Sequence, residues 1–133
     1  MRNMNDKISE LIISLKNAGL VGKSTASVPA SKLKKNVLLL LKKEGYIADF
    51  EEVGKGVTKS FTVKIAYNKD GTPKIKDLKR VSKLSVRKYS GYRDIRPVKY
   101  GHGLAVLSTP LGIISGKDAR SKKVGGELLF TIW

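Results

Sequence analysis

The hydrophobic period changes along this chain of 133 residues, and that change restricts the fold more than any other feature. The first apolar stripe has the spacing of a helix and consists of Ile8, Leu11, Ile12 and Leu15. Asn5 or Asp6 can begin this helix, and Gly19 can end it as a C-terminal cap. Residues 20–28 are rich in Ser, Thr and Val and predict a short strand that Pro29 stops.

A second helix is predicted from a cap at Ser31 to about Glu44, with Gly45 just past its end. Its apolar arc consists of Leu33, Val37, Leu40 and Leu41. A second arc is cationic, with Leu39 in it, and consists of Lys32, Lys35, Lys42 and Lys43. This face suits phosphate binding, and it suits an ordinary amphipathic surface helix equally well. Lys32 lies in the first turn, where the helix dipole disfavours a cation, so an external anion would rationalise it.

Strand-like runs dominate the remainder of the chain. Residues 46–53 and 59–66 predict two strands, and residues 68–71 predict a turn. Further extended segments are predicted at 75–81, 85–89, 104–107, 113–114 and 127–133, with one or two helical turns at 117–123. The predicted fold class is α+β, with an N-terminal α-β-α-β-β subdomain (residues 1–67) and a β-rich C-terminal subdomain (residues 68–133) that has one short helix.

The charge of the chain points to a polyanionic partner. It has 27 Lys and Arg residues against 11 Asp and Glu, a formal net charge of +16. Residues 69–99 alone have 11 basic and 3 acidic groups, with Tyr89, Tyr92 and Tyr100 in or beside them. Lysines neutralise phosphates and tyrosine rings stack on unpaired bases, although tyrosines also pack half-buried in small cores.

The same composition argues against catalysis and against a membrane location. There is no cysteine and a single histidine, His102, so we expect no disulfide, metal site, cofactor or catalytic triad, and no small-molecule substrate. The longest apolar run, residues 37–41, is far shorter than the roughly 20 residues that span a bilayer. No secretory signal is expected, and we predict a cytoplasmic protein that is not an enzyme.

Ordered motifs along the chain are more specific than its charge. In the first half they are Asn17-Ala18, residues 29–34 (PASKLK) and residues 44–47 (EGYI). In the second half they are residues 80–83 (RVSK), 87–89 (RKY), 103–109 (GLAVLST), 112–114 (GII), Ala119-Arg120 and 125–127 (GGE). The chain resembles the bacterial-type family of ribosomal small-subunit protein eight over residues 5–133.

This resemblance implies a primary binder of small-subunit (16S-type) ribosomal RNA, which nucleates folding of the central domain and directs platform assembly. It implies the ribosome as location, with an organelle ribosome left open, and neighbouring ribosomal proteins as partners. It also implies repression of the operon messenger RNA. The predicted RNA-binding residues are Ser31, Lys32, Lys35, Arg87, Tyr89, Ser108, Thr109, Pro110, Leu111, Gly112, Gly125, Gly126 and Glu127.

The resemblance also assigns roles to some of these residues. Ser108 and Thr109 would meet an irregular RNA helix, Gly112 would permit a tight approach, and Glu127 would brace the loop and accept hydrogen bonds. Pro110 and Leu111 stand where the family usually has a serine and a basic residue, so one hydroxyl and one cation are missing. The alternative prediction is a generic basic module that binds DNA or RNA.

Overall fold

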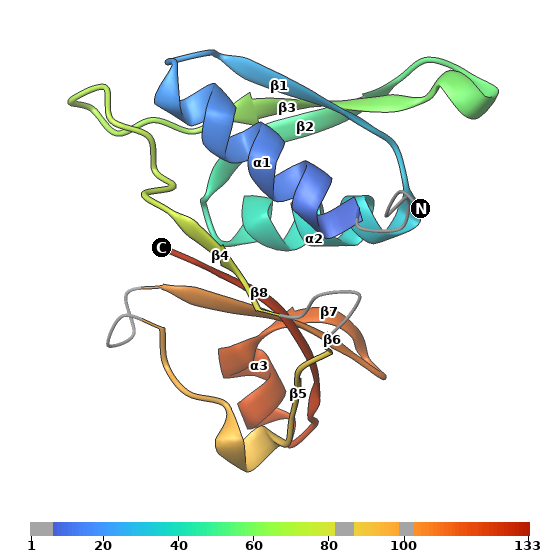
Figure 1. Ribbon diagram of the computed structural model, residues 1–133, viewed down its shortest axis with the longest axis vertical. Coiled ribbons are helices and arrows are strands. Elements are labelled where there is room, and N and C mark those ends of the chain that lie inside the picture. Colours follow the sequence, from blue (N-terminus) through green and yellow to red (C-terminus); the bar gives the residue numbers. More distant parts are fainter. Residues whose placement is uncertain (1–6, 82–86, 99–102) are drawn as a thin grey trace. The chain divides into compact units, whose positions relative to one another are not determined.

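The computed structural model describes residues 7–81, 87–98 and 103–133, which form an α+β fold (Figure 1). The chain divides into two compact units, with residues 7–76 in one and residues 77–133 in the other. The predicted fold class and the α-β-α-β-β order of the first half are confirmed. The turn at residues 68–71 follows Tyr67, which forms an isolated bridge with Pro73. The subdomain assignment 1–67 and 68–133 stays a prediction.

The N-terminal unit is a three-stranded antiparallel sheet covered by two helices. Its elements are α1 (Lys7–Leu20), β1 (Thr25–Pro29), α2 (Lys32–Lys43), β2 (Ile47–Val53), the short 3-10 helix η1 (Gly56–Thr58) and β3 (Ser60–Ile65), with strand order β1-β3-β2. Along β3, Phe61, Val63 and Ile65 are buried while Lys64 between them is exposed. One face of the sheet is therefore covered, and both helices lie on it (Figure 1).

The strand after α1 begins later than predicted. Leu20 belongs to α1, and Lys23 N donates to Ala18 O, so residues 21–24 form the turn that leads into β1. Pro29 pairs with Ser60 as the last residue of β1. Proline cannot donate a backbone hydrogen bond, and it is tolerated here because β1 is an edge strand.

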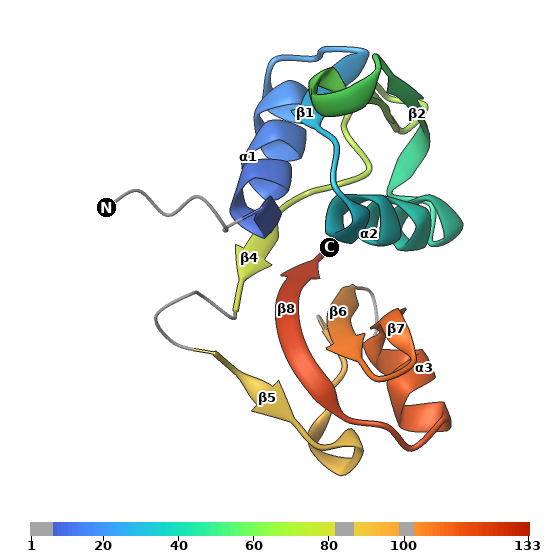
Figure 2. The ribbon, with the colours of Figure 1, turned by 90° about the vertical axis from the view of Figure 1, so that its right-hand side faces the viewer.

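The C-terminal unit is a five-stranded antiparallel sheet with one short helix. Its elements are β4 (Leu78–Arg80), β5 (Tyr89–Ser90), the 3-10 helix η2 (Tyr92–Asp94), β6 (Leu104–Thr109), β7 (Gly112–Ser115), α3 (Gly116–Ser121) and β8 (Gly126–Ile132). The strands run in the order β4-β8-β6-β7, and β5 also pairs with β8 (Figure 2). The predicted segment 85–89 lies partly outside the described residues.

One face of this sheet packs on α3. Ala119 of α3 is fully buried against Ala105 and Leu107 of β6 and Ile95, with Leu128 of β8 packed beside them. Successive residues of a strand point to opposite faces. Ser108, which follows Leu107, is therefore on the face that α3 does not cover.

Candidate functional site

The predicted hydroxyl loop is the hairpin between β6 and β7. Thr109 pairs with Gly112, so the loop itself consists of only Pro110 and Leu111. Thr109 Oγ1 accepts a hydrogen bond from Leu111 N at 3.1 Å and donates one to Gly112 O at 2.9 Å. Gly112 has a φ of 110°, which a side chain would strain. The Thr109 hydroxyl thus holds the turn, a role that the sequence did not reveal.

Ser108 and Thr109 point to opposite faces of the sheet because they are consecutive residues of β6. Ser108 is paired with Glu127 of β8, and Glu127 is paired with Tyr89 of β5. Directly opposed residues of antiparallel strands have their side chains on the same face. A serine hydroxyl, a carboxylate and a phenol therefore form one row across three strands, which we call the Ser108 row (Ser108, Glu127 and Tyr89).

The Ser108 row is open to solvent at Tyr89 and half-buried elsewhere. The Tyr89 side chain is 73% exposed, so the alternative of a tyrosine packed in the core does not apply to it. Tyr92 is half-buried against the α3 core, and Tyr100 lies outside the described residues. Ser108 is half-buried and forms no side-chain hydrogen bond with any residue in the described part of the chain. It is available to a ligand.

Glu127 is held by an arginine from the segment before β5. Arg87 Nη1 donates to Glu127 Oε2 at 2.9 Å, and the carboxylate side chain is only 16% exposed. This pairing compensates a carboxylate that would otherwise repel phosphate. Arg87 and Glu127 were both predicted to be near RNA, and the structure places them in contact with each other. Part of the hydrogen-bonding capacity of Arg87 is therefore used within the protein.

The paired glycines permit a close approach of backbones within the unit. A Cβ at Gly126 would lie 2.2 Å from Ser108 O, and a Cβ at Gly125 would lie 2.5 Å from Ser90 O. Real Cβ atoms do not approach oxygen so closely, so only glycine fits at either position. The glycines bring the start of β8 against β6 and β5. Their direct contribution is to assemble the Ser108 row.

The other predicted residues lie at the start of α2. Ser31 is confirmed as the N-cap, with Oγ accepting from Lys34 N at 3.1 Å. Lys32 and Lys35 are exposed beside a groove of about 720 Å³ between α2 and the β2–β3 connection. The groove also contains Leu39 and Lys59, and the latter forms an ion pair with Glu52 at 3.7 Å. This groove is therefore lined by both cationic and apolar side chains.

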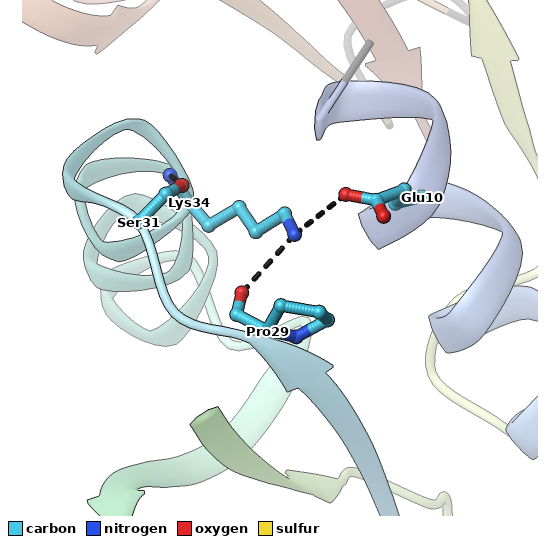
Figure 3. A network of polar contacts seen from close by, with 4 residues as sticks. All are labelled: Glu10, Pro29, Ser31 and Lys34. Carbon is cyan, nitrogen blue, oxygen red and sulfur yellow. Dashed lines mark hydrogen bonds and ion pairs between the residues drawn. The ribbon is translucent and has the colours of Figure 1, made fainter. Parts of the chain in front are cut away.

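A buried lysine at the start of α2 was missed by the sequence prediction (Figure 3). Lys34 is 1% exposed, and its Nζ donates to Glu10 Oε1 at 2.8 Å and to Pro29 O at 3.1 Å. It therefore joins α1, the end of β1 and α2. The helical spacing contained the signal, because Lys34 falls about 100° from Leu33, inside the arc of Leu41 and Leu38. Leu38, also absent from the predicted arc, is fully buried.

The predicted residues thus form two clusters, one in each unit. Arg87, Tyr89 and residues 108–112 and 125–127 gather in the C-terminal unit. Ser31, Lys32 and Lys35 gather in the N-terminal unit. Among the described residues, no helix is long and apolar enough to cross a membrane. Nor does that part of the chain bring together three acidic or histidine side chains able to hold a metal ion.

Comparison with known proteins identifies the class as ribosomal proteins, which are structural components and not a known class of enzyme. The family model for ribosomal protein S8 matches residues 6–133. A small ribosomal subunit protein uS8 of Synechococcus sp. is 44% identical over 131 residues, covering 98% of both chains. The uS8 proteins of Persephonella marina and Caulobacter vibrioides are each 42% identical, over 98% of this chain and 99% of theirs. The chain belongs to the ribosomal protein S8 family.

Proposed function

We propose that this chain is a constituent of the small ribosomal subunit that binds small-subunit ribosomal RNA and directs assembly of its central domain. Family membership and a net charge of +16 support a ribosomal role. The Ser108 row is the observation that carries the RNA-binding part. It offers an unengaged hydroxyl and an exposed aromatic ring on one face of a sheet, beside a carboxylate that Arg87 already compensates.

The chemistry of this row suits a distorted RNA stem better than a regular duplex. A short hydroxyl side chain reaches base edges and 2′-hydroxyls in the shallow minor groove of RNA, and a tyrosine ring stacks on an unpaired base. The lysines supply affinity that is independent of sequence, while the hydroxyl and aromatic groups supply orientation and specificity. Leu111, 57% exposed at the tip of the hairpin, adds an apolar contact.

The proposed RNA specificity is tested by binding to two transcripts over a range of salt concentrations. One is the central domain of small-subunit ribosomal RNA, and the other is an unrelated hairpin of similar length. We expect a clear preference for the ribosomal transcript, and Ser108→Ala should weaken that binding by about 1–3 kcal/mol while generic binding changes little. Equal affinity for both transcripts would reduce the protein to a generic basic nucleic-acid-binding module, the alternative function.

The α2 cluster contributes the sequence-independent part of the affinity in this proposal. Lys32 lies in the first turn of α2, next to the capping Ser31 and the exposed Lys35. Lys32→Ala should weaken binding to both transcripts alike and lower the log–log salt slope by about one unit. A salt slope equal to that of the wild type would exclude Lys32 as a phosphate contact.

The proposed partners follow from this role. They are small-subunit ribosomal RNA and neighbouring ribosomal proteins, on the ribosome in the bacterial cytoplasm. Repression of the operon messenger RNA is a further part of the proposal. It predicts that a transcript of that messenger competes with the ribosomal transcript for the protein, and that Ser108→Ala weakens both interactions.

A further inference from the structure

The segment formed by α3 and the two residues after it has four cations that the Ser108 row does not use. They are Lys117, Arg120, Lys122 and Lys123, and we call them the α3 patch. All four are exposed, and none forms an ion pair with any residue in the part of the chain that the structure describes. Asp118 is the one acidic residue within this segment and has an interaction of its own, so the patch keeps an excess of positive charge.

One of these cations stands where the backbone favours glycine. After α3, Val124 N donates to Ala119 O at 3.0 Å and Lys123 N donates to Arg120 O at 3.2 Å. This is the Schellman arrangement, in which the residue past the C-cap adopts a left-handed conformation that is usually glycine. Lys123 has a φ of 58°, and it is the one non-glycine residue with a positive φ in the described part of the chain. The left-handed backbone conformation of Lys123 therefore costs free energy that a glycine at this position would not cost.

The helix α3 is on the opposite side of the sheet from the Ser108 row. Ala119 packs α3 against Leu107 and Leu128, whereas Ser108 and Glu127, their neighbours in sequence, face away from α3. A ligand that lies on the Ser108 row is therefore separated from α3 by the thickness of the sheet. Cations on α3 would contact a different stretch of polyanion.

We propose that the α3 patch is a second phosphate-binding surface of the C-terminal unit, which contacts an RNA segment other than the one at the Ser108 row. The inference rests on the proposed RNA-binding function. It explains why four unpaired cations cluster within seven residues and why one of them occupies a position that favours glycine. The contacts at this surface are with phosphate, so they raise affinity without reading sequence.

The substitution Lys123→Gly tests the proposal because it is expected to move stability and binding in opposite directions. Glycine relieves the left-handed strain, so the thermal midpoint should rise by roughly 2–5 °C. Losing one phosphate contact should lower the log–log salt slope by about 0.9. When the variant and the wild type are scaled to equal affinity at 1 M salt, the variant should bind the central-domain transcript about eightfold more weakly at 0.1 M salt. A residue with only a structural role would not lose affinity while gaining stability.

Two variants control for charge and for the loss of the side chain. Lys123→Arg keeps the cation and should bind within about twofold of the wild type with an unchanged salt slope. Lys69→Gln removes an exposed lysine from the turn at residues 68–71, where no patch is proposed, and should have a smaller effect on the slope. Equal slopes for Lys123→Gly and Lys69→Gln would overturn the second surface, and a lowered thermal midpoint would overturn the strain argument.

The wild type separates this inference from the proposed function. If the wild type does not prefer the central-domain transcript to the control hairpin, the proposed function fails. If the wild type shows the preference and Lys123→Gly leaves affinity and slope unchanged, only the α3 patch fails.

Discussion

The two clusters of candidate RNA-binding residues are organised by different physical means. At the start of α2, side-chain hydrogen bonds position the cluster, because the Ser31 cap and the buried Lys34 fix the helix end on which Lys32 and Lys35 lie. In the C-terminal unit the backbone positions the residues, because strand register aligns the Ser108 row and two glycines bring β8 close to its neighbours. A cluster held by side chains tolerates graded change, whereas one held by backbone contact does not.

The largest effect is therefore expected at a glycine of the C-terminal unit. The substitution Gly126→Ala would place a Cβ 2.2 Å from Ser108 O, and backbone has no flexible end that can move aside. We expect a loss of about 2–4 kcal/mol in the free energy of unfolding, measured by urea denaturation, together with loss of the preference for ribosomal RNA. The matched control is Gly19→Ala in α1, where the new Cβ would meet only the Pro73 side chain at 3.4 Å. That variant should be neutral or stabilised by up to about 1 kcal/mol, and an equal loss in both would contradict the argument.

The next effect breaks the side-chain cluster. Lys34→Ala removes a buried aliphatic stem and the two hydrogen bonds of its ammonium group, to Glu10 and to Pro29 O. We expect a loss of about 2–3 kcal/mol in the free energy of unfolding. The value stays moderate because the Glu10 side chain is 53% exposed and can be solvated when its partner is gone.

Lys35→Ala is the control for Lys34→Ala, because Lys35 is the next residue of α2 and is exposed. Its stability should stay within about 0.5 kcal/mol of the wild type while its RNA affinity falls. The two neighbouring lysines would then separate cleanly, one affecting folding and the other binding. If Lys34→Ala unfolded no more easily than Lys35→Ala, Lys34 could not be the group that holds the end of α2.

This contrast between neighbouring lysines shows how far sequence reasoning reached. The helical stripes, the Ser31 cap and the α-β-α-β-β order follow from local spacing and capping chemistry, and the structure confirms them. The burial of Lys34 depends on Glu10, which is 24 residues away, and the sequence analysis did not pair them. Lys34 was assigned to neither the apolar nor the cationic arc of this helix, although its position on the helical wheel is that of the core.

The candidate site was predictable by residue and not by role. The motifs identified Ser108, Thr109, Gly126 and Glu127 as candidates. Which of their side chains share a face depends on the alternation of successive residues between the two faces of a strand. Ser108 belongs to the row with Glu127, whereas the Thr109 hydroxyl is engaged in the turn. These roles depend on strand register and on the bulge of β8 opposite Val106 and Leu107, neither of which the linear sequence specifies.

A smaller effect tests that division between Ser108 and Thr109. Thr109→Ala removes the hydroxyl that accepts from Leu111 N and donates to Gly112 O, so the hairpin should lose about 0.5–1.5 kcal/mol of stability. Thr109→Ser keeps the hydroxyl and should retain most of this stability, and urea denaturation of the two variants measures the difference. In RNA binding, Ser108→Ala should cost more than Thr109→Ser. Because Thr109→Ser removes only a methyl group, the reverse order would mean that this methyl group contributes more to RNA binding than the Ser108 hydroxyl does.

The smallest effect concerns an exposed ion pair of the N-terminal unit, for comparison with the buried Lys34. Lys42 Nζ lies 2.9 Å from Asp49 Oδ1, and both side chains are about half exposed. The hydrogen bond from Lys42 is the main cause that lowers the pKa of Asp49, and the Phe50 amide is the second. Because the pKa is lower in the folded state, the stabilisation is complete above the unfolded-state pKa of Asp49. It is lost as the pH falls through the lower folded-state pKa.

Asp49→Asn should therefore weaken folding slightly at neutral pH and make the urea midpoint less sensitive to acid. The measurement is the urea midpoint at pH 7 and at a pH below the folded-state pKa, for this variant, the wild type and Glu51→Gln. Glu51 is an exposed carboxylate on the same strand that has no ion pair with any described residue, so Glu51→Gln controls for the loss of one unpaired negative charge. Solvent screens this exposed ion pair and not the Lys34 ammonium, so Asp49→Asn should shift the urea midpoint less than Lys34→Ala does. Equal shifts would mean that burial does not distinguish the two ion pairs.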